Sequence, residues 1–148
     1  MNSKKQKPII GKNDIADFPK FGLSNIKVKI DSGAYTSSIH CSLIKEIDDC
    51  LEVVFLSKKV KGYTGEKLFF NNFTVKRVKS SSGEAQLRYK IKGDILLFNK
   101  KYNTEFTLSK RSEMRYPVLL GRKLLNKKFL IDTSLSNQSF NIKTEKNQ

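Results

Sequence analysis

Polar and apolar residues alternate along the chain in short runs, which is the pattern of half-buried β-strands. Ile26, Val28 and Ile30 are apolar, whereas Lys27 and Lys29 between them are charged. The same kind of pattern predicts further strands over 51–56, 68–78 with a break at 71–72, 87–98, 106–108 and 129–131. Because the strands are many and short, they indicate a mostly β domain.

Polar segments between these strands predict the turns. Residues 80–83 read Ser-Ser-Ser-Gly and are expected to form a tight turn, and 99–103 a polar hairpin loop. The apolar run 117–121 ends in glycine and is followed by a single helical turn over 122–125. No long amphipathic helix is predicted, so we expect short helices at most.

The length of 148 residues corresponds to one domain. We expect a disordered basic arm over 1–8, a single folded domain over 9–142 and a polar tail over 143–148. No apolar run approaches the ~18 residues of a transmembrane helix, and the apolar segment after the lysine-rich start is too short for a signal peptide. Cys41 and Cys50 make no disulfide framework. We therefore expect a cytoplasmic protein without a membrane partner.

The chain is strongly basic, with 29 Lys and Arg residues against 14 Asp and Glu residues and a formal net charge of +15. A charge of this size attracts polyanions. The composition therefore predicts an acidic partner, which by charge alone is a nucleic acid, an anionic membrane or an acidic peptide.

The residues able to hold a metal or a nucleotide are few. The sequence contains one histidine, His40, and no Cys and His cluster with the spacing of a metal site. The glycine-rich loop that cradles phosphates is also missing from it. We therefore expect neither a metal nor a cofactor, and we interpret His40 as a structural or surface residue.

The sharper signal for chemistry is a carboxylate at the end of a predicted strand. Residues 31–34 read Asp-Ser-Gly-Ala, a tight turn that can present the side chain of Asp31, although such a sequence is also an ordinary turn. An apolar-apolar-glycine run follows later, at 118–121. Between the two, 75–90 predicts a β-hairpin with its tip at 80–84.

In this order, the segments resemble aspartic proteases of the retroviral type. In particular, the chain resembles a bacterial and archaeal retropepsin-like family often labelled as ATP-dependent zinc proteases. The resemblance is carried by residues 9–11, 27–40, 77–83, 88–89 and 111–122. It implies a closed retropepsin-like β-barrel with a flap hairpin. Because the sequence shows no zinc ligand set and no nucleotide loop, we set aside both parts of the label.

The resemblance implies that Asp31 is the catalytic residue of an aspartic endopeptidase. Such catalysis needs two carboxylates that share one proton, and the chain has a single Asp-Ser-Gly triplet. A homodimer with Asp31 from each copy is therefore expected. Asp132 begins a similar triplet, but Ser134 replaces the glycine, which makes Asp132 the weaker candidate for a partner within the chain.

Candidates for substrate binding follow from the same resemblance. They are Ser32, Gly33 and Ala34 of the catalytic turn, Ser81, Ser82 and Gly83 of the flap tip, and Arg77, Arg88 and Arg122. Arginine can bind carboxylates through two parallel hydrogen bonds, and the net charge of +15 favours polyanions, so we expect an acidic polypeptide as substrate. The resemblance implies that this polypeptide is glutamate-rich. The alternative for the arginines is a solvated face with a few salt bridges. Glu84 and Gln86 stand where the family commonly has His and Glu, so their role stays open.

A second hypothesis keeps the fold without the catalysis. An inactive module would use its basic surface to bind RNA, the ribosome or an acidic protein. We favour nucleic acid less, because the aromatic residues lie in strand patterns that need them for the core and no RNA-binding motif is present. The substitution Asp31→Asn should abolish peptidase activity but barely affect an electrostatic binder.

Overall fold

The computed structural model describes residues 6–79, 81–110 and 115–146. The strands are β1 (Ile9–Ile10), β2 (Asn13–Phe18), β3 (Leu23–Ile30), β4 (Ser37–Ile47), β5 (Cys50–Phe55), β6 (Leu68–Phe70), β7 (Thr74–Lys79), β8 (Ala85–Leu97), β9 (Lys100–Ser109), β10 (Val118–Leu120) and β11 (Leu130–Ile131). The helical elements are η1 (Pro19–Phe21), α1 (Arg122–Leu125) and α2 (Gln138–Lys146). The protein is mostly β with short helices, as predicted.

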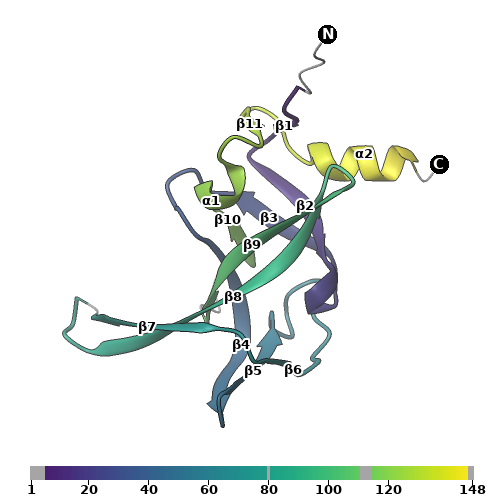
Figure 1. The fold of residues 1–148 in the computed structure, drawn as a ribbon. Coiled ribbons are helices and arrows are strands. Elements are labelled where there is room, and N and C mark those ends of the chain that lie inside the picture. Colours follow the sequence, from purple (N-terminus) through teal and green to yellow (C-terminus); the bar gives the residue numbers. More distant parts are fainter. Residues whose placement is uncertain (1–5, 80, 111–114, 147–148) are drawn as a thin grey trace.

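Six of these strands close into a barrel (Figure 1). Around the ring they follow the order β3, β2, β8, β9, β4 and β10. The ring closes because β10 pairs in parallel with β3 on one side and antiparallel with β4 on the other. The predicted closed barrel is therefore confirmed, and β10 is the strand that joins its two edges.

The alternation in the sequence becomes an alternation in burial. Along β3, Ile26, Val28 and Ile30 point into the core, whereas Lys27 and Lys29 are exposed. Phenylalanine rings from β2, η1, β5, β6 and β9 pack in stacked and edge-on contact, namely Phe18, Phe21, Phe55, Phe70 and Phe106. Burial of these large apolar side chains is the main source of stability for the barrel.

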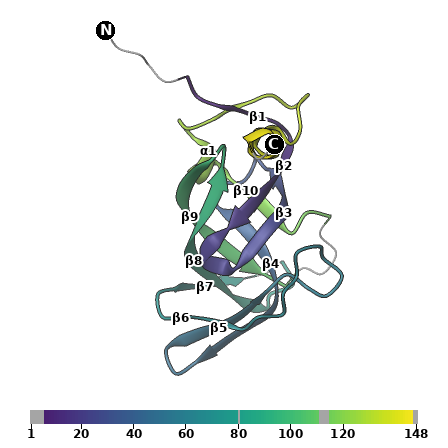
Figure 2. The same cartoon turned by 90° about the vertical axis from the view of Figure 1, so that its right-hand side faces the viewer.

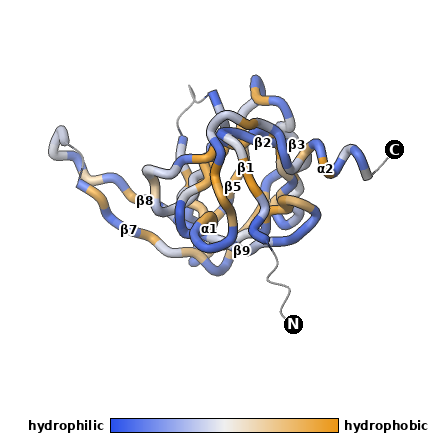
Figure 3. Tube along the Cα trace, turned by 90° about the horizontal axis from the view of Figure 1, so that it is seen from above, coloured by the Kyte–Doolittle hydropathy of each residue, from blue (hydrophilic) through white to orange (hydrophobic). Residues whose placement is uncertain are grey.

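The longest strand, β8, belongs to two parts of the molecule. Its second half pairs with β9 in the barrel, and its first half pairs with β7 in a hairpin that projects away from the barrel body (Figure 1). Hydrophilic and apolar positions are interspersed along this hairpin (Figure 3), and most of its side chains are exposed. This is the flap hairpin that the sequence predicts.

At one end of the barrel, β1, β11 and α2 lie together (Figures 1 and 2). The side chain of Asp14, on β2, reaches the start of α2 and accepts hydrogen bonds from the backbone N–H groups of Ser139 at 2.9 Å and Phe140 at 3.1 Å. A barrel strand thus caps the helix and fixes it to the barrel.

The hairpin loop predicted over 99–103 is wrong. The turn consists of Phe98 and Asn99 alone, with φ values of 53° and 59°, and Lys100 already pairs with Leu97. Asparagine tolerates this left-handed conformation, but phenylalanine rarely adopts it, so a two-residue turn that begins at Phe98 is not expected from the residue types. The ring of Phe98 packs against Phe129, with 5.9 Å between ring centroids, and this contact favours the tight turn.

Three other elements differ from the prediction. The strands β2 and β4 were not predicted, and the polar tail expected over 143–148 is helical as far as Lys146, with 147–148 outside the described part. Of the arm expected over 1–8, residues 1–5 also lie outside it, and residues 6–8 form neither strand nor helix. Within the described ranges, none of the helices has the length and apolar character needed to span a membrane.

Candidate active site

The loop between β3 and β4 carries the candidate catalytic carboxylate. The backbone N–H of Asp31 donates to the carbonyl of Leu120 at 2.9 Å, so the residue is tied to β10 where β3 ends. Within the turn, the N–H of Gly33 donates to Oδ1 of Asp31 at 3.1 Å, and the N–H of Ala34 donates to the carbonyl of Asp31 at 3.2 Å. The Asp31 carboxylate is half-buried, and the turn around it is closed by its own hydrogen bonds.

The start of α1 holds the other side of this loop. The N–H groups of Arg122 and Lys123 donate to the carbonyls of Ala34 and Tyr35, both at 2.8 Å. Gly121 lies so close that a Cβ on it would be 2.6 Å from the carbonyl oxygen of Tyr35. Only glycine fits at this position without displacing the loop. The apolar-apolar-glycine run singled out in the sequence therefore does pack beside the Asp31 turn.

Two side chains add to this clamp, Ser37 and Arg122, and only Arg122 is a site residue predicted from the sequence. The buried hydroxyl of Ser37 accepts a hydrogen bond from the N–H of Gly121 at 3.0 Å. Nη1 of Arg122 donates to the carbonyl of Ser32 at 2.9 Å, and its guanidinium lies 5.8 Å from the centroid of the Tyr35 ring. Arg122 thus contacts the Asp31 turn itself. Ser37 could have been found only from the fold, because its partner is 84 residues away.

An open groove of about 1210 Å³ lies between the β7–β8 hairpin and the barrel. Its lining includes Ala34, three residues after Asp31. It also includes Leu119, which precedes Leu120, the residue whose carbonyl accepts the N–H of Asp31. The cationic side chains in its lining are Lys76, Arg77, Lys79, Arg88, Lys90 and Lys110. The described residues that line the groove include no acidic side chain. The groove is therefore suited to a polyanion or an acidic peptide.

The hairpin separates some of the predicted site residues. Arg77 pairs with Leu87 and Arg88 pairs with Lys76, so the two arginines project from opposite faces. Ser81, Ser82 and Gly83 are exposed at the tip, beyond the part of the hairpin that lines the groove. These roles in substrate binding stay predictions.

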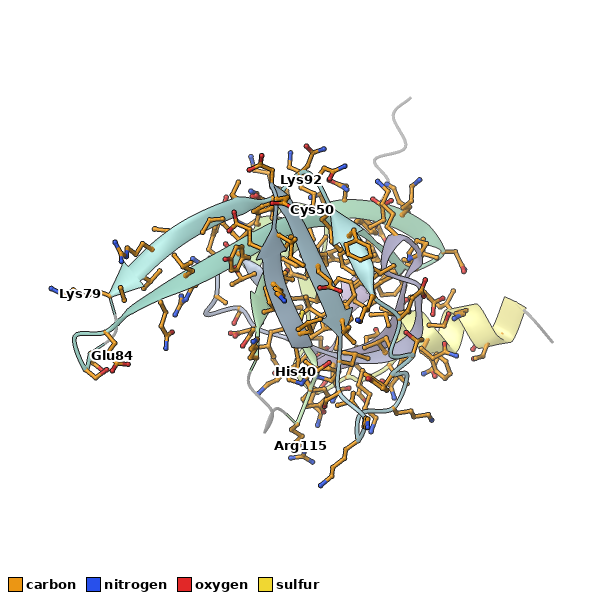
Figure 4. All side chains as sticks on the ribbon, turned by 90° about the horizontal axis from the view of Figure 1, so that it is seen from below. His40, Cys50, Lys79, Glu84, Lys92 and Arg115 are labelled. Atoms are coloured by element: carbon orange, nitrogen blue, oxygen red, sulfur yellow. The ribbon has the colours of Figure 1, made fainter. Side chains whose placement is uncertain are left out.

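The two positions that depart from the family pattern also lie apart. Glu84 is at the exposed far end of the hairpin, near Lys79 and far from His40 and Arg115 in the barrel body (Figure 4). Gln86, in contrast, lines the groove. The hairpin thus places Gln86 where it can face a bound chain and Glu84 outside that region.

Other titratable groups singled out from the sequence lie outside this cluster. Oδ1 of Asp132 accepts hydrogen bonds from the N–H and hydroxyl of Ser134, which lower the pKa of Asp132. Burial lowers the pKa of His40, and a backbone contact with Ser109 offsets part of this effect. Cys41 is buried, which raises the pKa of its thiol. Asp132 caps its own turn, and His40 and Cys41 are interior residues of β4.

A family model described as retropepsin-like aspartic endopeptidase RimB matches residues 9–140. The fold agrees with this match. A crystal structure of a Legionella pneumophila protein of unknown function superposes with a TM-score of 0.70 at 24% sequence identity, covering 90% of this chain and 99% of that one.

The curated relatives carry a different name. A probable alpha-L-glutamate ligase of Shewanella pealeana is 37% identical over 132 residues, and one of Parasynechococcus marenigrum is 30% identical over 142 residues. These alignments cover 86% and 90% of this chain but only 29% of either relative. The match to the family model over 9–140, together with the barrel and the clamped Asp31 turn, shows that the chain belongs to the RimB-like family of retropepsin-like aspartic endopeptidases.

Proposed function

We propose that this protein is an aspartic endopeptidase whose active site forms from Asp31 of two copies. The observation that carries the proposal is the clamped turn beside the groove, in which β10 binds the backbone of Asp31 and the start of α1 binds the carbonyls of Ala34 and Tyr35. Each copy supplies one such carboxylate, and a two-fold axis beside the turn brings two together.

The chemistry follows from two carboxylates that share one proton. The ionised carboxylate takes a proton from a water molecule, whose oxygen attacks the peptide carbonyl carbon, while the protonated carboxyl gives its proton to the carbonyl oxygen, which yields a gem-diol. The carboxyl that took the proton from water then passes it to the nitrogen as the C–N bond breaks, and the other carboxylate takes back one hydroxyl proton of the gem-diol, so the dyad again holds one proton. In the turn, the N–H of Gly33 donates to Oδ1 of Asp31 and orients the carboxylate for this exchange.

We further propose that the substrate is an acidic, glutamate-rich polypeptide. The support is the cationic groove beside the Asp31 turn, together with a net charge of +15. The name of the relatives points in the same direction, since they are called probable alpha-L-glutamate ligases and contain a segment similar to this chain. A peptidase joined to such a ligase would act on the glutamate-containing chains that the ligase makes. The chain spans less than a third of these relatives, at 29%, so we do not extend the ligase activity to it.

The test compares a polyglutamate peptide with a lysine-rich peptide of equal length, at low and high salt. We expect the wild-type protein to cleave the acidic peptide, and more slowly as salt screens the attraction. Asp31→Asn should abolish cleavage while leaving the fold intact, because the Asn Oδ1 still accepts the hydrogen bond from Gly33. Equal cleavage of both peptides would refute the acidic specificity.

The same experiment addresses the alternative of an inactive binding module. If neither peptide is cleaved and both the wild type and the Asp31→Asn variant bind RNA equally well, the basic surface serves a nucleic acid and the peptidase proposal fails. Loss of activity on treatment with chelators alone would equally contradict a mechanism that rests on two carboxylates.

A further inference from the structure

We infer that Lys76, Arg88 and Lys90, called here the hairpin trio, form a distal anion subsite. In this subsite they bind carboxylates of an acidic chain several residues away from the bond that is cleaved. The inference rests on the proposed function. It names the side chains that recognise the acidic chain and their distance from the dyad.

The strand register places the hairpin trio on the sheet face that lines the groove, which extends to Ala34 of the Asp31 turn. Residues paired between neighbouring strands point to the same face of a sheet. One row of paired residues crosses from β10 to β8 through Leu119, Ser38, Thr107 and Lys90. All members of this row line the groove, and Leu119 is next to Leu120, whose carbonyl binds the N–H of Asp31. Lys90 thus lies on the groove face.

The other two members lie on the same face of the hairpin, where it projects beyond β9. Lys76 and Arg88 are directly opposite each other on β7 and β8. Two like charges in this position destabilise a strand pair. The neighbouring positions on this face hold Thr74, Val78 and Gln86, so the hairpin itself supplies no negative charge there. A bound carboxylate would offset the repulsion.

The acidic residues of β8 and β9 that share this face already have partners. Asp94 lies 3.4 Å from Lys20 and accepts a hydrogen bond from Asn103, and Glu105 is bound by Lys123. Glu105 pairs with Lys92 in the β8–β9 register. The pKa of Glu105 is lowered, first by a hydrogen bond from Lys123 and to a smaller extent by Lys90 and Lys92. None of the ion pairs between described residues includes a member of the hairpin trio. The trio is therefore available to a ligand.

The spacing of the trio matches an extended chain. Arg88 and Lys90 are two residues apart on one strand, about 7 Å, which is also the distance between side chains on one face of an extended peptide. The sheet path from β10 through β4 and β9 to β8 crosses three strand spacings. That is about 14 Å, which an extended chain covers in roughly four residues. With the further ~7 Å between Lys90 and Arg88, carboxylates about four to six residues from the cleaved bond would reach the trio.

The test measures binding to the full chain carrying Asp31→Asn, so that no cleavage interferes. Fluorescein-labelled glutamate chains of about four and about ten residues, chosen from this spacing, are titrated at fixed salt and followed by anisotropy. We expect the longer chain to bind more tightly. Replacing all three members of the trio by Gln should raise the Kd of the longer chain roughly tenfold, because each exposed charge contact contributes about a two- to threefold change in Kd. Binding of the shorter chain should hardly change.

A matched control removes the same amount of charge elsewhere. Lys58, Lys59 and Lys61 are exposed on a loop outside the groove lining, and their joint replacement by Gln should weaken binding less than the trio replacement does. Equal losses in the two triple variants would overturn the inference, because net charge alone would then explain the binding. Tighter, trio-dependent binding of a ten-residue oligouridine would overturn it as well, by assigning the subsite to a nucleic acid.

Cleavage by chains that retain Asp31 separates the two proposals. A trio variant with a raised KM and an unchanged kcat on a glutamate-rich peptide supports the subsite. If the wild type cleaves that peptide and the trio variant has the same KM, the subsite is refuted and the peptidase stands. If trio-dependent binding occurs but no chain is ever cleaved, the anion subsite stands and the peptidase is refuted.

Discussion

Small residues around the Asp31 turn hold the carboxylate in place without touching it. Ser37 is fully buried, and its hydroxyl accepts the N–H of Gly121. Gly121 in turn leaves room for the loop, since a Cβ there would be 2.6 Å from the carbonyl oxygen of Tyr35. The position of Asp31 therefore depends on a serine and a glycine that would have no part in the reaction.

Ser37→Ala tests this support. The substitution leaves the buried N–H of Gly121 without its acceptor, which should lower the free energy of unfolding by about 1–3 kcal/mol. Urea denaturation measures the change. Ser42→Ala is the matched control, because Ser42 is exposed and makes only a 3.5 Å hydrogen bond to Val54, so its stability should stay close to that of the wild type. Similar losses in both variants would contradict a special role for Ser37.

Arg122 was predicted to bind substrate, whereas its hydrogen bond to Ser32 makes it a positioning residue for the Asp31 turn. Its Nη1 donates to the carbonyl of Ser32, so Arg122→Ala should loosen the turn and lower kcat by about tenfold, the scale of one charge-assisted hydrogen bond, with little change in KM. Arg122→Lys, which can still donate to that carbonyl, should recover part of the rate. A raised KM with unchanged kcat, relieved by shorter acidic substrates, would instead support substrate binding.

At the scale of elements, the sequence predicts β3, β8 and the end of β9 in the barrel, and the turn that carries Asp31, but it misses β2 and β4. The alternation in β3 and the Asp-Ser-Gly triplet are local signals, and both are confirmed as a strand and a clamped turn. β4 escapes prediction because it passes from the barrel to a second hairpin with β5, and its register shifts between Cys41 and Leu43. Buried positions along it therefore follow no single period.

Helix α2 escapes prediction for another reason. Its sequence has few apolar residues, and the side chain that caps it, Asp14, is 125 residues away in the sequence from Ser139.

The candidate site is likewise only partly predictable from local sequence. The Asp31 turn is visible in the sequence, but Ser37 and the shared face of Lys76 and Arg88 depend on pairings between distant strands.

The capping of α2 by Asp14 makes a prediction about stability. Asp14→Ala removes the acceptor of two helix N–H groups and should lower the free energy of unfolding by about 1–2 kcal/mol, as for other helix caps. Hydrogen exchange should show that the amides of α2 lose protection before those of the barrel. Uniform loss of protection throughout the chain would show instead that Asp14 supports the barrel as a whole.

Asp14 also predicts a dependence on pH. Burial raises the pKa of its carboxyl above the usual 3.8, and hydrogen bonds from backbone N–H groups offset only part of this. Between pH 3.8 and the raised value, the folded state binds more protons than the unfolded state, so this contribution to stability falls as the pH rises. Asp14→Asn does not titrate. The stability of the wild type relative to this variant, measured by urea denaturation, should therefore decrease with rising pH above 3.8.

At the scale of the whole molecule, several basic side chains are concentrated along the groove. Part of the excess of +15 lines the groove beside the Asp31 turn, where the described lining has no acidic side chain. The groove and the turn belong to one copy, but two carboxylates are needed for the proposed chemistry. The complete site would therefore be a property of the dimer, with one cationic groove on each side of the dyad.

Mixing two forms of the chain tests this assembly directly. The wild type is held at a fixed concentration, with the glutamate-rich peptide in large excess, and Asp31→Asn protein is added. If the dyad needs Asp31 from both copies and subunits exchange at random, an equal amount of variant should lower the rate to about half, and further variant should lower it more. An unrelated basic protein at the same concentration is the control for effects of charge and should leave the rate unchanged. A rate that stays constant as the variant is added in excess would mean that one chain suffices for cleavage, and the shared dyad would have to be abandoned.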